Sequence, residues 1–134
     1  MRLLVLVALL FSFEVHAESW VFLGHGKPLY PGQVVNDTSY DTDSFTKKEN
    51  SATVWVKYTN PDRPDESRQR LAMDCSSREY VFLEQYDLRQ KSNGTIEKVQ
   101  IPISRLFANS IMIIVPNSDL EQVYTAACNY KPSV

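Results

Sequence analysis

Few residues of this chain have the types and spacing that chemistry requires. His25 stands between Gly24 and Gly26, where an imidazole would be accessible as a general base or metal ligand. A single imidazole cannot make a zinc site, and no Gly-x-Ser-x-Gly elbow supplies a nucleophile. The sequence therefore favours an exposed loop histidine, and it predicts no enzymatic activity, no cofactor and no metal site.

Three acidic residues, Asp37, Asp41 and Asp43, fall within seven positions. Their carboxylates are of the kind that binds Ca²⁺. The spacing of an EF-hand loop, its central glycine and its terminal glutamate are missing, so the pattern favours a turn held by Asx hydrogen bonds.

Arginines and aromatic residues are the candidates for binding rather than catalysis. Arg63, Arg68, Arg70 and Arg78 lie close together and alternate with acidic residues. Arginine is enriched at protein interfaces, whereas the two prolines in residues 60–68 favour a solvated loop. The candidate protein-binding residues are Trp55, Arg68 and Arg70.

The aromatic residues near Trp55 have two interpretations. Tyr80, Phe82 and Tyr86 follow each other at even spacing, which would place all three on one side of a strand. Together with Trp55 they would form either an exposed face for a ligand or part of the core, where strand aromatics are more common.

The N-terminus has the features of a secretory signal peptide. Arg2 precedes an apolar run at residues 3–13, which is too short to span a bilayer, and Val15-His16-Ala17 fits a cleavage site. We expect a signal peptide at 1–17 and one soluble exported domain at 18–134 without membrane insertion. In an oxidising compartment, Cys75 and Cys128 are the one pair available for a disulfide.

The charge balance limits the classes of partner. The formal net charge is −2 over 134 residues. A mildly acidic chain has no global attraction for nucleic acid or for anionic lipid. We therefore expect no nucleic-acid partner.

The hydrophobic pattern predicts an α+β fold, in which an antiparallel β-sheet meander is covered by a C-terminal helix. A short apolar run predicts a strand at 20–23, alternating residues predict strands at 53–58, 70–75 and 78–87, and 96–101 would be the returning strand of a hairpin. Asn93-Gly94 predicts a type I′ hairpin turn. Ser118 and Glu121 form a capping box for a helix over 119–130, so a Cys75–Cys128 bond would join this helix to the sheet. Residues 36–50 are interpreted as polar and turn-rich, with Tyr40 and Phe45 as anchors.

The order of these features resembles the surface-adhesin protein E family of small exported bacterial proteins. The resemblance rests on Tyr40-Asp41 with Ser44, Val54-Trp55-Val56-Lys57, Asp74-Cys75 with Arg78, Tyr86 before Asn93-Gly94, and Pro116 with Ser118, Glu121, Tyr124 and Cys128. It implies a curved antiparallel sheet, a C-terminal helix and the Cys75–Cys128 bridge. It also implies adhesion to host extracellular proteins, although this chain lacks the lipobox cysteine of the surface-anchored member.

Two functions follow as expectations. The first is a non-enzymatic protein-binding module in the periplasm or the medium, with a host extracellular matrix protein as a candidate partner. The alternative is a periplasmic protein that binds a small ligand or an envelope component, and a hydrolase is a further alternative. Edge strands can also pair with a second copy, so the sequence is compatible with a homodimer.

Overall fold

The structure, a computed structural model, describes residues 18–26, 30–32, 35–102 and 110–132. The expected signal peptide lies outside these residues. The elements in chain order are β1 (Trp20–Gly24), β2 (Asp37–Asp41), the short 3-10 helix η1 (Thr42–Ser44), β3 (Thr46–Lys48), β4 (Ser51–Asn60), β5 (Arg63–Asp74), β6 (Glu79–Gln90), β7 (Ile96–Ile101), β8 (Met112–Ile113) and α1 (Asp119–Cys128).

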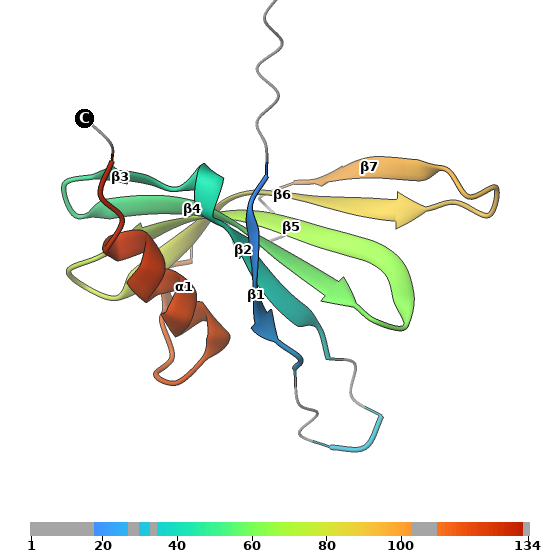
Figure 1. The fold of residues 1–134 in the computed structure, drawn as a ribbon, viewed down its shortest axis with the longest axis horizontal. Coiled ribbons are helices and arrows are strands. Elements are labelled where there is room, and N and C mark those ends of the chain that lie inside the picture. The colour runs from blue at the N-terminus through green and yellow to red at the C-terminus, as the bar shows by residue number, and fades with distance from the viewer. Residues whose placement is uncertain (1–17, 27–29, 33–34, 103–109, 133–134) are drawn as a thin grey trace, which may run out of the picture.

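All the strands belong to one curled antiparallel sheet. The order is β1-β2-β4-β5-β6-β7, while β3 pairs with the start of β4 and β8 with the start of β6. Figure 1 shows α1 at one end of this sheet, with the β4–β5 and β6–β7 hairpins extending away from it at the other end. The predicted α+β fold, an antiparallel sheet with a C-terminal helix, is confirmed.

The core lies between α1 and one end of the sheet. Alternating residues of β4 and β5 face the helix, and the helix contributes one apolar side, as its spacing predicts. The buried apolar residues are Ala52, Val54, Val56, Leu71, Met73, Ile114, Val123, Tyr124 and Ala127. Tyr40 and Phe45, the expected anchors, pack against this core.

The ends of α1 follow from its local sequence. Ser118 is the N-cap, and its hydroxyl oxygen accepts a hydrogen bond from the Glu121 amide at 3.2 Å, as predicted. The Glu121 carboxylate accepts the amide of Asn117 rather than that of Ser118. The helix ends at Cys128, two residues before the expected end. None of the helices in the described residues is long and apolar enough to cross a membrane.

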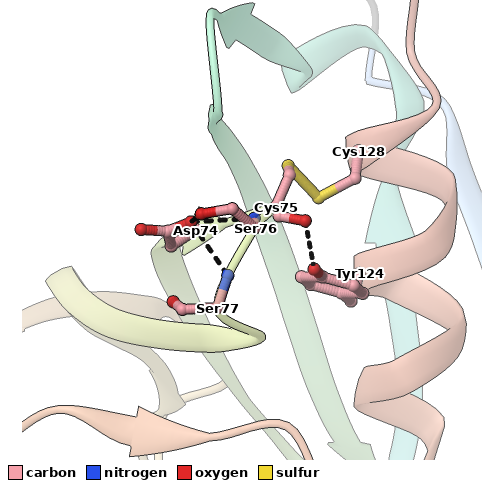
Figure 2. The surroundings of a disulfide bond; sticks show 6 residues. All are labelled: Asp74, Cys75, Ser76, Ser77, Tyr124 and Cys128. Carbon is pink, nitrogen blue, oxygen red and sulfur yellow. Dashed lines mark hydrogen bonds between the residues drawn. A yellow bond between two sulfur atoms is a disulfide. The ribbon is translucent and has the colours of Figure 1, made fainter.

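The predicted disulfide joins α1 to the turn between β5 and β6. Cys75 and Cys128 are bonded, with their Cα atoms 5.7 Å apart. Figure 2 shows the Tyr124 hydroxyl, one helical turn earlier, donating to the Cys75 carbonyl oxygen at 2.8 Å. The Asp74 carboxylate accepts the hydroxyl of Ser76 and the amides of Ser76 and Ser77, and these hydrogen bonds fix the turn and lower the pKa of Asp74.

Two segments that the sequence assigned to loops or turns are largely strand. The expected loop at 60–68 is a turn of two residues followed by β5, which starts at Arg63. Pro64 is tolerated there because it lies at the hairpin tip, before the register with β6 begins at Glu66. The expected turn-rich stretch at 36–50 contains β2 and β3, because both pair with β4.

A β-bulge changes which side chains of β6 share a face. Leu71 pairs with Phe82, and Arg70 pairs with Glu84, so Leu83 is an extra residue without a partner on β5. Tyr80 and Phe82 face the helix, but Tyr86 lies on the opposite face. The prediction that these three aromatics share one side is therefore wrong.

The turn at Asn93-Gly94 is present but differs in type from the prediction. Only Gly94 has a positive φ, of 83°, whereas a type I′ turn needs two such residues. The Gly94 amide donates to the Lys91 carbonyl at 2.9 Å, and Asn93 accepts from the amide of Thr95. This pattern fits a longer hairpin loop that is closed by a left-handed glycine.

The disulfide gives a stability prediction. The two cysteines are 53 positions apart, and for a loop of this size Cys128→Ser should lower the free energy of unfolding by about 4 kcal/mol. Denaturant titration of both proteins measures the loss. A reductant should destabilise the unchanged protein by a similar amount and leave the variant unaffected. Equal stability of the two unreduced proteins would contradict the prediction.

Candidate functional site

The sheet face opposite α1 carries the residues with the strongest binding chemistry. We call it the open face. Its central rows follow the strand register: Trp55 pairs with Arg70 and Arg70 with Glu84, while Lys57 pairs with Arg68 and Arg68 with Tyr86. The open face therefore brings together all three candidate residues of the sequence, Trp55, Arg68 and Arg70.

Arg68 is the centre of this arrangement. Its Nη1 atom lies 2.8 Å from Glu18 Oε1 and 3.3 Å from the Tyr86 hydroxyl. Its Nε and Nη2 atoms donate to Glu66 at 3.3 and 3.2 Å. The Arg68 side chain is only 15 % exposed. Because its donors are directed at partners within the chain, Arg68 positions the neighbouring side chains rather than offering free hydrogen bonds.

Aromatic rings and cations alternate around Arg68. The Trp55 and Tyr86 rings are tilted against each other, with centroids 5.4 Å apart. Lys98 Nζ lies 4.2 Å from the centroid of Tyr86, and Lys57 Nζ lies 4.4 Å from that of Trp20. These distances fit cation–π contacts, which hold both members of each pair in place.

The edge strand β1 completes the site. Arg68 lies 5.2 Å from the Trp20 ring, although two strands separate β1 from β5. The Trp20 indole N–H donates to Glu18 at 2.9 Å. This hydrogen bond and the charge of Arg68 lower the pKa of the Glu18 carboxyl, and partial burial opposes them. Glu18 therefore links the edge strand to Arg68 as a carboxylate.

The three candidate residues differ in accessibility. The Arg70 side chain is 44 % exposed, and its ion-pair contact with Glu84 is long at 3.9 Å. Trp55 is half-buried against Tyr86. Arg70 and Trp55 can therefore contact a partner directly, whereas Arg68 holds Tyr86, against which Trp55 packs.

The residues gathered around Arg68 and Tyr86 on the open face form one cluster. Sequence reasoning missed four of its members: Glu18, Trp20, Lys57 and Lys98. Lys57 is two positions after Trp55, so strand alternation signals that they share a face. No such signal exists for Trp20 or Glu18, because the order in which β1 and β2 join the sheet cannot be read from periodicity.

The remaining sequence candidates lie apart from this cluster. His25 is exposed, as expected, and its Nδ1 atom is 2.9 Å from Asp37. Asp41 accepts the amides of Ser19 and Asp43, which is the predicted Asx turn. Among the residues described, no group of three or more histidine, cysteine or acidic side chains could hold a metal ion.

Two clefts flank the sheet. One, of about 390 Å³, is lined by residues that include Ala72, Val81, Lys48 and Ile111. The other, of about 260 Å³, is polar and lies on the helix side of the sheet, beside Ser67, Gln85 and Asp87. Tyr58 also lines it, and burial raises the pKa of Tyr58 to about 12, so this phenol stays neutral.

The chain matches no family model, no curated protein and no solved structure.

The contacts of Arg68 predict different effects for two neighbouring arginines. Arg68→Ala should lower the free energy of unfolding by about 2 kcal/mol, because Glu18 and Glu66 lose a hydrogen-bonded counterion. Arg70→Ala should change it by less than about 0.5 kcal/mol, as expected for an exposed side chain. Denaturant titration measures both. Equal losses would show that Arg68 does not organise the open face.

The lowered pKa of Glu18 predicts an acid-sensitive contact. A depressed carboxyl pKa adds stability above its ordinary value of 4.5, and this contribution is lost as the pH falls through the lower folded value. Trp55→Phe leaves Trp20 as the single tryptophan, and its fluorescence should change in this acidic range. Introducing Glu18→Gln into the Trp55→Phe variant should abolish this fluorescence change. A fluorescence change that persists unaltered would come from the titration of another group.

Proposed function

We propose that this protein is a non-catalytic, exported binding module that takes a protein partner on its open face. The observation that carries the proposal is the cluster of Trp55, Arg70 and Tyr86 on the open face, in which Arg68 holds Tyr86 and Tyr86 packs against Trp55. Tryptophan, tyrosine and arginine are the residues that most often dominate binding energy at protein interfaces.

The cluster is ordered before any partner binds. Trp55 packs against Tyr86, and the Tyr86 hydroxyl and ring both contact Arg68. Side chains that are already held in one conformation lose less entropy on binding, so more of their contact energy contributes to affinity. This supports recognition of a folded surface or an extended segment.

The charges of the open face favour a partner with acidic groups. Arg68 neutralises Glu18 and Glu66. Lys57 and Lys98 instead form cation–π contacts with aromatic rings, and neither lysine takes part in an ion pair of the described residues. A carboxylate placed between these lysines and Arg70 would meet positive charge and aromatic edges. We therefore expect aromatic packing together with charge pairing.

Two further features support an exported, adhesin-like role. The disulfide suits an oxidising compartment, which agrees with the signal-like N-terminal sequence. The sequence features shared with the surface-adhesin protein E family suggest host extracellular matrix proteins as partners.

Binding to matrix proteins tests the proposal. The purified protein should adhere to surfaces coated with extracellular-matrix extract, and Trp55→Ala with Arg70→Ala should weaken adhesion at least tenfold. Arg89→Ala is the matched control, because Arg89 is a similarly exposed arginine on the helix side of the same sheet. Binding constants are measured by surface plasmon resonance.

Two outcomes would contradict the proposal. One is adhesion that Arg89→Ala reduces as much as Arg70→Ala does. The other is reproducible turnover in a hydrolase screen that His25→Ala abolishes, since this would make the protein an enzyme.

The cleft of about 390 Å³ supports the second candidate function, binding of a small ligand or envelope component. Its size is within the usual range for ligand pockets, and both apolar and polar side chains line it. Val81→Trp would fill this cleft. Ligand binding that is lost in Val81→Trp and kept in Trp55→Ala would favour this second function.

A further inference from the structure

The sheet edge formed by β8 lacks the protection that the other edges have. β3 carries two lysines in three residues, and β7 carries Glu97 and Lys98. β1 has a register shift between Phe22 and Gly24. Charged side chains and bulges are two of the features by which edge strands avoid pairing with another chain, and β8 has neither, although its short length is a third such feature.

The segment around β8 is instead apolar and exposed. Residues 110–115 contain no charged side chain. Ile111, Ile113 and Val115 are 64 %, 70 % and 63 % exposed, whereas Ile114 between them is buried. Three large apolar side chains therefore form a row on one side of an edge, where solvent contact is unfavourable.

The backbone of this edge is open at Ile113, whereas the Val115 carbonyl oxygen accepts hydrogen bonds from Ser118. The Ile114 amide donates to the Arg78 carbonyl at 2.9 Å, toward β6. Because successive residues of a strand direct their amide and carbonyl groups to opposite edges, those of Ile113 point away from β6. Within the described ranges, no strand pairs with this side of β8.

We propose that β8 pairs antiparallel with β8 of a second copy of this chain, with the twofold axis at Ile113. In this register Ile113 lies opposite the partner's Ile113, and Ile111 lies opposite the partner's Val115. The two Ile113 residues exchange amide-to-carbonyl hydrogen bonds, which uses the open groups of both edges.

A second copy fits this edge because residues 110–115 are complementary to themselves. Antiparallel pairing places apolar side chains opposite apolar side chains on the same face, and no like charges meet. Ile111 also lines the cleft above Ala72 and Val81, so the partner's Val115 would stand at the margin of that cleft and exclude water from it. Pro116 limits the pairing to this short run.

The pairing leaves the open-face cluster free. β8 pairs with Glu79 and Tyr80, six or more residues along β6 from Tyr86. A twofold axis that joins two antiparallel edges keeps the same face of both sheets on the same side. The dimer would thus present two open faces side by side, but the inference does not depend on the proposed function.

The mass in solution tests the dimer. The interface is short, and small interfaces associate weakly. Size-exclusion chromatography with light scattering should therefore give a mass that rises with concentration toward that of two chains. Ile113→Lys places two charges at the twofold axis and should keep the protein monomeric. Ile96→Lys changes a similarly exposed isoleucine on the β7 edge and should leave association intact.

Cysteine cross-linking tests the register. Hydrogen-bonded antiparallel pairs have Cα atoms about 5.5 Å apart, within the range of disulfides. Ile113→Cys should therefore form an intermolecular disulfide under mild oxidation at least tenfold faster than Ile96→Cys. Equal rates would refute the register. A protein that remains monomeric up to about 1 mM, or association that Ile96→Lys abolishes equally, would overturn the proposal.

Discussion

The Cys75–Cys128 disulfide joins α1 to the β5–β6 turn, and the rest of the structure depends on where this bond holds the helix. Ten helical residues are about 15 Å long, whereas the twelve residues of β5 extend over about 40 Å. The helix can therefore cover only one end of the sheet. The apolar residues of β4 and β5 gather at that end, and the polar residues Ser67, Gln69 and Gln85 occupy the same face beyond it.

The uncovered face needs another means of ordering its large side chains, and Arg68 provides it. A guanidinium has donors in several directions, so one side chain can bind two carboxylates and a phenol at once. Arg68 does so with Glu66 from its own strand, Tyr86 from β6 and Glu18 from the segment before β1. A lysine could not replace it, because its ammonium lacks this planar geometry. The open face is thus rigid without a second layer of structure.

Much of the fold could be predicted from local sequence signals. Three features depend only on residues close in sequence and can therefore be predicted from it: the alternation around Trp55, the cap at Ser118 and the helical spacing of Val123 and Ala127. β5 was only partly predicted, because Pro64 and its charged neighbours have the composition of a loop. Their strand conformation comes from pairing with β4, which is a long-range effect. The candidates Trp55, Arg68 and Arg70 share a face for the same reason, whereas Trp20 joins them only through the strand order.

The bulge at Leu83 has a consequence for how such a chain changes in evolution. Phe82 and Glu84 lie opposite consecutive residues of β5, so the bulge takes Leu83 out of the register. Loss of Leu83 would therefore restore regular alternation and leave Tyr86 on the open face, opposite Arg68. A one-residue deletion elsewhere in β6 would instead shift the register and turn the side chains beyond it to the other face. Two chains of this fold could thus differ by one residue in the length of β6 and still present the same surface to their partners.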